Sequence, residues 1–125
     1  MIEIKKNLIP SSEQLCPLYS GSVPSPEAMR SSAIYTAFDG SRLAGILRAV
    51  GDHSEIMYIQ DLLILPEYQH KGLGRQMLSA FMRDAQSVKQ IVLLTDNDEE
   101  TIEFYRSSGF APAEERYLAA LIRVN

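Results

Sequence analysis

Apolar residues in this chain form short runs separated by turn-forming residues, which indicates a mixture of strands and helices. The alternation in residues 1–6 predicts a first strand. The runs AIYTAF and SRLAGILRAV flank Asp39-Gly40, and an Asp-Gly turn between β-rich runs predicts a hairpin. After a turn at Gly51-Asp52, EIMYIQDLLIL is almost continuously apolar, which is typical of a strand covered on both faces.

The pattern changes to a helical one after the run LLIL. From Leu73 to Ala85, apolar residues recur on one face and polar residues lie on the other, which predicts a helix. KQIVLLT then predicts a buried strand, residues 97–110 a second helix, and RYLAALIRV a last strand. A strand–helix–strand order predicts a parallel, right-handed crossover. We therefore expect an α+β fold with a mixed sheet and helices packed on its faces.

Composition narrows the class of protein. A length of 125 residues predicts one domain over residues 1–125, and 46% apolar with 22% charged residues is typical of a globular protein. The net charge of −4 argues against a nucleic-acid binder. Cys16 and the two histidines show no metal-ligand spacing, so no metal site is expected. No apolar stretch reaches about 20 residues and no signal-peptide pattern is present, so we expect a cytoplasmic protein without a membrane segment.

The stretch PEYQHKGLGR, residues 66–75, places two glycines between an apolar strand and a helix. Such a turn forms an anion site, because the first N–H groups of the helix are unpaired and the helix dipole adds positive potential. The alternative is a tight turn that needs glycine only for its dihedral angles. A Walker loop is excluded because Lys71 precedes Gly72, and a Rossmann fingerprint because Met77 replaces its third glycine.

Two motifs together identify a family. Gln69, Gly72 and Gly74 form a Gln-x-x-Gly-x-Gly motif after an apolar strand, and FYRSSGF follows at residues 104–110. This combination resembles the GNAT superfamily of acyl-CoA-dependent N-acetyltransferases. The resemblance implies a central, mostly antiparallel sheet of about six to seven strands with splayed central strands and helices on both faces. It also implies transfer of an acetyl group from acetyl-CoA to a primary amine by direct attack in a ternary complex.

The resemblance assigns the coenzyme-binding residues. The loop would hold the coenzyme A pyrophosphate and the preceding strand the pantetheine arm. The loop residues are Gln69, His70, Lys71, Gly72, Leu73, Gly74 and Arg75, and the strand residues are Leu63, Ile64 and Leu65. Many members bond the pantetheine arm with an asparagine, and this chain has Asp98 at that position with Asn97 beside it. That role is therefore expected at either residue, or is lost.

The resemblance also indicates how the chemistry would proceed. Tyr105 occupies the position of the tyrosine that protonates the coenzyme A sulfur, and its alternative is a helix tyrosine packed beside Phe104. An N–H of the central strand, that of Leu63, would meet the oxyanion.

The catalytic base is left open by the sequence. Asp61 would act as the base directly or through water, or it would instead bind a cationic substrate or the backbone. Alternation places Gln60 and Asp61 on opposite faces unless the strand contains a bulge. The other candidates on the substrate side are Glu55, Tyr58 and Gln60.

The acceptor expected from these residues is a small-molecule or peptide amine, and family analogy adds a homodimer through the C-terminal strand or an exposed sheet edge. A non-catalytic acyl-CoA sensor is the main alternative, because an intact loop binds coenzyme with or without chemistry. Tyr105 favours the enzyme, since a sensor needs no acid at the sulfur. A protein-interaction module would leave the glycine loop unexplained.

Overall fold

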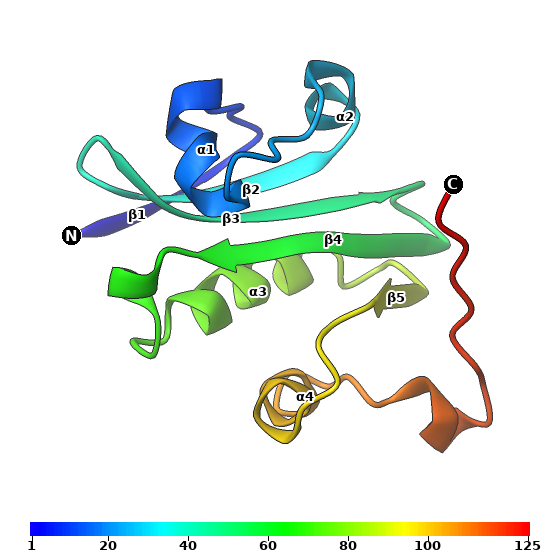
Figure 1. Ribbon diagram of the computed structural model, residues 1–125. Helices are drawn as coiled ribbons and strands as arrows, with labels where there is room; N and C mark the ends of the chain where they lie inside the picture. Colours follow the sequence, from blue (N-terminus) through cyan, green and yellow to red (C-terminus); the bar gives the residue numbers. More distant parts are fainter. The chain divides into compact units, whose positions relative to one another are not determined.

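A computed structural model describes residues 1–125, which divide into two compact units, Met1–Leu94 and Thr95–Asn125 (Figure 1). The first unit contains β1 (Ile2–Lys6), α1 (Ser12–Tyr19), α2 (Pro26–Arg30), β2 (Ala33–Asp39), β3 (Arg42–Gly51), β4 (Ile56–Ile64), a 3-10 turn (Pro66–Tyr68), α3 (Leu73–Asp84) and β5 (Gln90–Leu93). The second contains α4 (Glu99–Arg106) and a 3-10 turn (Ala113–Arg116).

The sheet has five strands in the order β1-β2-β3-β4-β5. The first four are antiparallel neighbours, and β5 runs parallel to β4 after the crossover through α3, as the sequence predicts. The predicted hairpin is present, with Gly40 in a left-handed conformation at its turn. The mostly antiparallel mixed sheet is confirmed, but with fewer strands than the six to seven expected.

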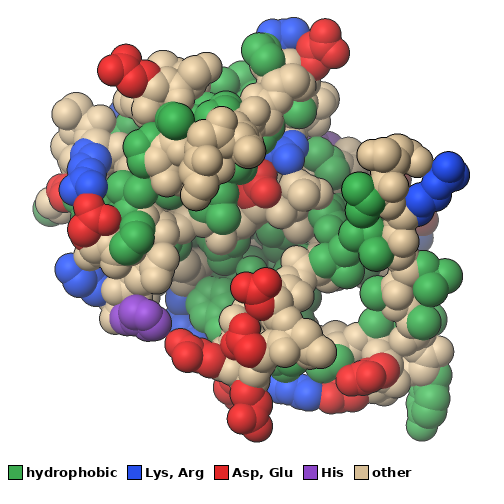
Figure 2. Space-filling view, in the orientation of Figure 1, with side chains coloured by type: hydrophobic (Ala, Val, Ile, Leu, Met, Phe, Trp, Pro, Cys, Tyr) green, Lys and Arg blue, Asp and Glu red, His purple; other side chains and the backbone are tan.

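The missing strand is the predicted C-terminal one. RYLAALIRV forms no strand, and its large apolar side chains are exposed: Tyr117, Leu118, Leu121, Ile122 and Val124. Figure 2 shows hydrophobic side chains along this segment. Alternating apolar and polar residues suit a strand, but the strand's backbone groups must also pair with a neighbouring strand. The second unit contains no other strand. The homodimer expected through this segment stays a prediction.

Helices cover both faces of the sheet in the first unit. α1 and α2 lie on one face and α3 on the other (Figure 1). The α1–α2 side contains a buried cluster of Leu15, Leu18, Met29, Ile34, Phe38, Leu43, Ile46 and Leu65. On the α3 side, Met77 and Leu78 are buried, and the rings of Tyr35 and Phe81 meet edge-on at 5.8 Å. Burial on both faces explains why the strand sequences are nearly continuous apolar runs.

The central strands splay where β4 changes its pairing. β4 pairs with β5 only from Ile56 to Ile59, and beyond that point its sole partner is β3. The register between β3 and β4 shifts at the same place, because Arg48 faces Asp61 while Ala49 faces Ile59. Gln60 is therefore the extra residue of a β-bulge, which bends the strand and interrupts its alternation.

Gly45 is predicted to be required for packing α3 on the sheet. A Cβ at this position would lie 2.8 Å from Ile64 Cδ1, 3.1 Å from Met77 Sδ and 3.2 Å from the Leu63 carbonyl oxygen. Gly45→Ala should therefore lower the free energy of unfolding by about 1–3 kcal/mol, measured by urea denaturation. Ser41→Ala, at an exposed position, is the control. A stabilised Gly45→Ala variant would show that the neighbouring side chains move aside and that only backbone entropy matters.

Candidate active site

The N-terminus of α3 presents unpaired backbone N–H groups. Its N-cap is Gly72, which has φ 83° and ψ 3°, provides no side-chain cap, and is followed by no acidic residue in the first turn. The first hydrogen bond of the helix runs from Gln76 N to the Gly72 carbonyl oxygen at 3.1 Å. The N–H groups of Leu73 and Gly74 therefore have no partner within the helix and can donate to an anion.

The loop before α3 is exposed and positively charged. His70, with φ 62°, and Gly72 adopt left-handed conformations, and His70, Lys71 and Arg75 are exposed. A Cβ added to Gly72 would have nothing within 4 Å. Glycine is therefore required there by φ, and the space beside it is open to a ligand. The loop has the geometry and the charge of an anion site.

Gln69 folds back onto the end of β4. Its Nε2 donates to the carbonyl oxygen of Ile64 at 2.9 Å. This side chain fastens the loop to the strand, which is a role that the motif alone does not reveal.

Backbone groups in the second half of β4 divide between two sides. Leu65 N donates to the Ala44 carbonyl oxygen at 2.9 Å, so the backbone N–H and carbonyl groups of Leu65 point toward β3. Because these groups alternate along a strand, those of Leu63 point the same way. The backbone N–H and carbonyl groups of Leu62 and Ile64 point to the opposite side of β4, where β5 no longer pairs with it. Of the three strand residues expected to bind the pantetheine arm, only Ile64 faces this open side. The Leu63 N–H, expected to meet the oxyanion, points toward β3 instead.

Asp61 belongs to an ion-pair network that the sequence did not reveal. Its Oδ2 accepts hydrogen bonds from Arg48 Nε at 2.7 Å and from the Tyr19 hydroxyl at 2.8 Å. The Arg48 and Asp61 side chains are only 12% and 15% exposed. Both bonds go to one oxygen, which leaves Oδ1 without a partner in the chain. The only sign of Arg48 in the sequence is a single charge within AGILRAV.

The network joins four elements of the α1–α2 side. Arg48 Nη1 donates to Ser32 Oγ at 3.1 Å, and Ser32 Oγ donates to the Ala28 carbonyl oxygen at 2.6 Å. Tyr19 ends α1, Ala28 lies in α2, Arg48 in β3 and Asp61 next to the bulge in β4. The bonds therefore hold both helices against the point where β4 and β5 part.

The remaining substrate-side candidates are not gathered around Asp61. Glu55 precedes β4 and pairs with Lys89 at 3.2 Å on the surface. Tyr58 is half-buried in the part of β4 that is paired on both sides, opposite Val50 and Val92. Only Gln60, exposed at the bulge, is next to Asp61.

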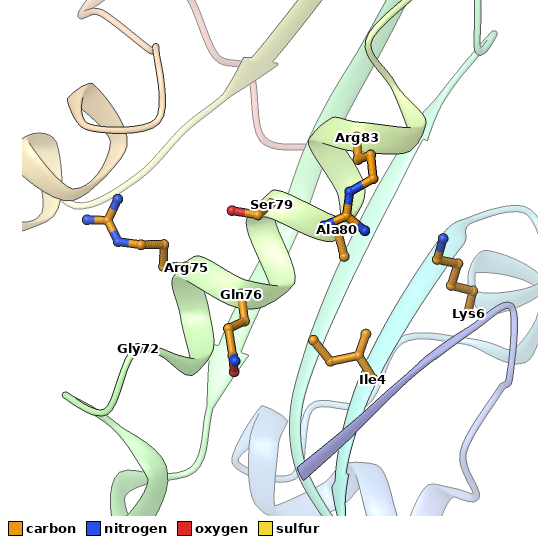
Figure 3. A pocket seen from close by; sticks show the side chains of 8 residues that line it. All are labelled: Ile4, Lys6, Gly72, Arg75, Gln76, Ser79, Ala80 and Arg83. Atoms are coloured by element: carbon orange, nitrogen blue, oxygen red, sulfur yellow. The ribbon is translucent and has the colours of Figure 1, made fainter.

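A groove of about 500 Å³ lies between β1 and α3 and begins at the loop (Figure 3). It is lined by Ile4, Lys6, Gly72, Arg75, Gln76, Ser79, Ala80 and Arg83. Three of these residues are cationic and none is acidic, although Lys6 also pairs with Asp84 at 2.8 Å. The positive potential of the loop therefore extends along α3.

Tyr105 lies in the second unit, on α4. Its ring packs edge-on against those of Phe104 and Phe110, with distances of 5.0 and 5.8 Å between the ring centroids. Burial raises the pKa of Tyr105 above its ordinary value, so the hydroxyl stays protonated at neutral pH. Gly109 adopts a left-handed conformation after the helix.

The N-terminus of α4 uses one of the residues expected to bind pantetheine. Asp98 is the N-cap, and its carboxylate accepts hydrogen bonds from Thr101 N at 2.9 Å and Thr101 Oγ1 at 3.0 Å. Asn97 is exposed just before the helix. Figure 2 shows acidic side chains gathered over α4, which carries Glu99, Glu100 and Glu103.

No group of three or more His, Cys, Asp or Glu side chains could hold a metal ion. No helix has the length and apolar character needed to cross a bilayer.

Comparison with known proteins identifies a family. The family model described as an acetyltransferase (GNAT) domain matches residues 30–112. A probable acetyltransferase of Glycine max is 33% identical over 90 residues, which are 70% of this chain and 36% of that protein. The chain thus spans little more than a third of the length of the curated relatives it matches.

Two solved structures extend the comparison. A GNAT-family acetyltransferase of Streptococcus pneumoniae is 33% identical with a TM-score of 0.90, over 100% of this chain and 98% of that one. A GNAT-family acetyltransferase of Elizabethkingia anophelis, solved with acetyl-CoA bound, shares the fold at 22% identity and a TM-score of 0.69, over 87% and 75%.

The Tyr19–Asp61 hydrogen bond predicts a specific loss of stability at alkaline pH. Burial, and then the bond to Asp61, raise the pKa of Tyr19. The folded protein keeps this proton above about pH 10, where the unfolded chain loses it. The stabilisation is therefore complete below about pH 10 and is lost as the pH rises toward the folded-state pKa.

Tyr19→Phe should lower the free energy of unfolding by about 1–3 kcal/mol at pH 7, and this difference should shrink steadily above about pH 10. Tyr117→Phe, at a tyrosine that is 98% exposed, is the control and should show no such change. A difference that stays constant with pH would show that the hydroxyl contributes only through packing.

Proposed function

Because the chain belongs to the GNAT family of acetyltransferases, we propose that it transfers the acetyl group of acetyl-CoA to a primary amine by direct attack in a ternary complex. The observation that carries the proposal is the uncapped N-terminus of α3 at the end of a splayed β4. This arrangement presents donors for a polyanion next to an open strand edge for an amide-bearing chain. Coenzyme A carries both, as its pyrophosphate and its pantetheine arm.

The loop would hold the pyrophosphate. The N–H groups of Leu73 and Gly74 donate to its oxygens, and Lys71 and Arg75 add positive charge. The missing Cβ of Gly72 lets the phosphates approach the backbone. The pantetheine amides would then pair with Leu62 and Ile64 on the open side of β4, as an added strand would.

The acceptor amine, which is cationic at neutral pH, first releases a proton to solvent. Attack of the neutral amine on the thioester then forms the new C–N bond and puts negative charge on the carbonyl oxygen. The N–H groups on the open side of β4, those of Leu62 and Ile64, are the donors available to that oxygen. Collapse of the intermediate breaks the C–S bond, the nitrogen loses its surplus proton to solvent, and the leaving thiolate takes a proton. Tyr105 would supply that proton, and its raised pKa keeps it protonated until this step.

Asp61 would bind the acceptor as an ammonium ion. Oδ2 already accepts two hydrogen bonds, which leaves Oδ1 for a further donor. A primary amine with a pKa near 10 is almost entirely cationic at neutral pH, so a fixed carboxylate at the bulge would select it. The proposed acceptor is thus a cationic amine, from a small molecule or a peptide.

Calorimetric titration with acetyl-CoA and a thiol-release assay over a panel of amines test the proposal. We expect binding and turnover in the wild-type protein. Tyr105→Phe should keep its affinity for acetyl-CoA and lose about a hundredfold or more in kcat. Tyr117→Phe serves as the control. Binding without turnover on any amine would support the acyl-CoA sensor, and the absence of binding would refute the coenzyme site.

Asp61→Asn separates substrate binding from proton abstraction. If Asp61 binds the ammonium, KM for cationic amines should rise about tenfold or more while kcat changes little. A fall in kcat at unchanged KM, with loss of the acid limb of the pH profile, would identify Asp61 as the base instead. Thermal unfolding of the variant should accompany the kinetics, because Asn also weakens the bond to Arg48.

A further inference from the structure

Side chains fasten the turn before the loop to the tip of the β2–β3 hairpin. The Tyr68 hydroxyl donates to Asp39 Oδ2 at 2.5 Å, and Arg42 forms an ion pair with Glu67. The Arg42 guanidinium also lies over the Tyr68 ring, 5.6 Å from its centre. Asp39 and Arg42 face each other across the hairpin turn, so the turn itself brings these two side chains together. We call Asp39, Arg42, Glu67 and Tyr68 the hairpin clamp.

The chain from β4 to the loop is fixed at each step. Tyr68 N donates to the Leu65 carbonyl oxygen at 2.9 Å and Gln69 N to that of Pro66 at 3.2 Å, which close the 3-10 turn. The Gln69 side chain then bonds to Ile64. Beyond these bonds, His70 and Lys71 are exposed and make no side-chain hydrogen bond or ion pair. The bonds that fix the beginning of the loop are therefore made by the residues immediately before it.

We propose that the hairpin clamp is a positioning device for the phosphate-binding loop, so that four residues other than the Gln-x-x-Gly-x-Gly residues set the affinity for the coenzyme. The inference rests on the proposed function. A loop that is already ordered loses less entropy when it binds a ligand, so a fixed loop binds more tightly. The clamp acts through Tyr68 and Glu67 on the backbone of the loop and does not touch the coenzyme.

Because the hairpin clamp is exposed, its effect on the loop can be measured separately from the global stability of the protein. The Arg42 and Glu67 side chains are 54% and 55% exposed. Exposed ion pairs contribute little to the free energy of unfolding. Clamp variants should therefore fold normally and differ in local order and in coenzyme affinity.

The test compares acetyl-CoA with S-acetylpantetheine, a thioester donor that lacks the pyrophosphate. Tyr68→Phe and Arg42→Ala should each raise KM for acetyl-CoA about 5- to 20-fold and leave KM for S-acetylpantetheine and kcat unchanged. The matched control is Lys5→Ala, because Lys5 is also an exposed cation, with Glu3 at 3.8 Å and the Phe38 ring at 5.1 Å. Exchanging the charges with Arg42→Glu and Glu67→Arg together should restore much of the affinity.

Two results would overturn the proposal. Equal effects on both donors would show a general loss of structure. An effect of Arg42→Ala without one of Tyr68→Phe would show that Arg42 contacts the phosphate directly, because Tyr68→Phe removes no charge.

Amide hydrogen exchange tests the clamp without coenzyme. Exchange at residues 69–72 should rise in Tyr68→Phe relative to the wild-type protein and to Lys5→Ala. Unchanged exchange would refute the positioning role. Failure of the wild-type protein to bind coenzyme A would refute the proposed function, and the exchange result would still decide whether the clamp orders the loop.

Discussion

β4 has two partners along its first half and one along its second, and the candidate site depends on that difference. Backbone groups within a sheet are normally paired, because an unpaired N–H or carbonyl away from water is unfavourable. The pairing with β5 ends at Ile59, which leaves the backbone groups of Leu62 and the N–H of Ile64 open on one side. The Ile64 carbonyl oxygen accepts the bond from Gln69. An open edge there can accept a ligand that resembles a strand, whereas an edge at the rim would also invite another chain.

The Arg48–Asp61 ion pair lies where the strands part, and its importance is geometric. A largely buried ion pair adds little net stability, because removing two charges from water offsets most of their attraction. Removing one partner is nevertheless strongly destabilising, so the pair fixes where its elements sit. Through Tyr19 and Ser32 it joins both helices of one face to the bulge. The same contacts use only one carboxylate oxygen of Asp61.

Local signals in the sequence predicted the elements well, and the site only in part. The Asp39-Gly40 turn and the helix from Leu73 each follow from a few adjacent residues. The bulge at Gln60 does not, because it depends on how β4 pairs with β3. The same register turns Leu63 away from the open side, which no alternation pattern within β4 could show. The prediction of a C-terminal strand was wrong for a related reason, because the sequence pattern of RYLAALIRV does not show whether a neighbouring strand is present to pair with it.

The loop before α3 is held in place although no side chain of the protein caps the N-terminus of the helix. α1, α2 and α4 are capped by the side chains of Ser11, Ser25 and Asp98, each of which fills the space in front of the first N–H groups. A side-chain cap contributes about 1 kcal/mol, and α3 has none. Its N-terminus is held instead by bonds made before the loop, from Tyr68 and Gln69. Because this order comes from outside the loop, the N–H groups of Leu73 and Gly74 stay unpaired and a phosphate can occupy the place that a capping side chain would have filled.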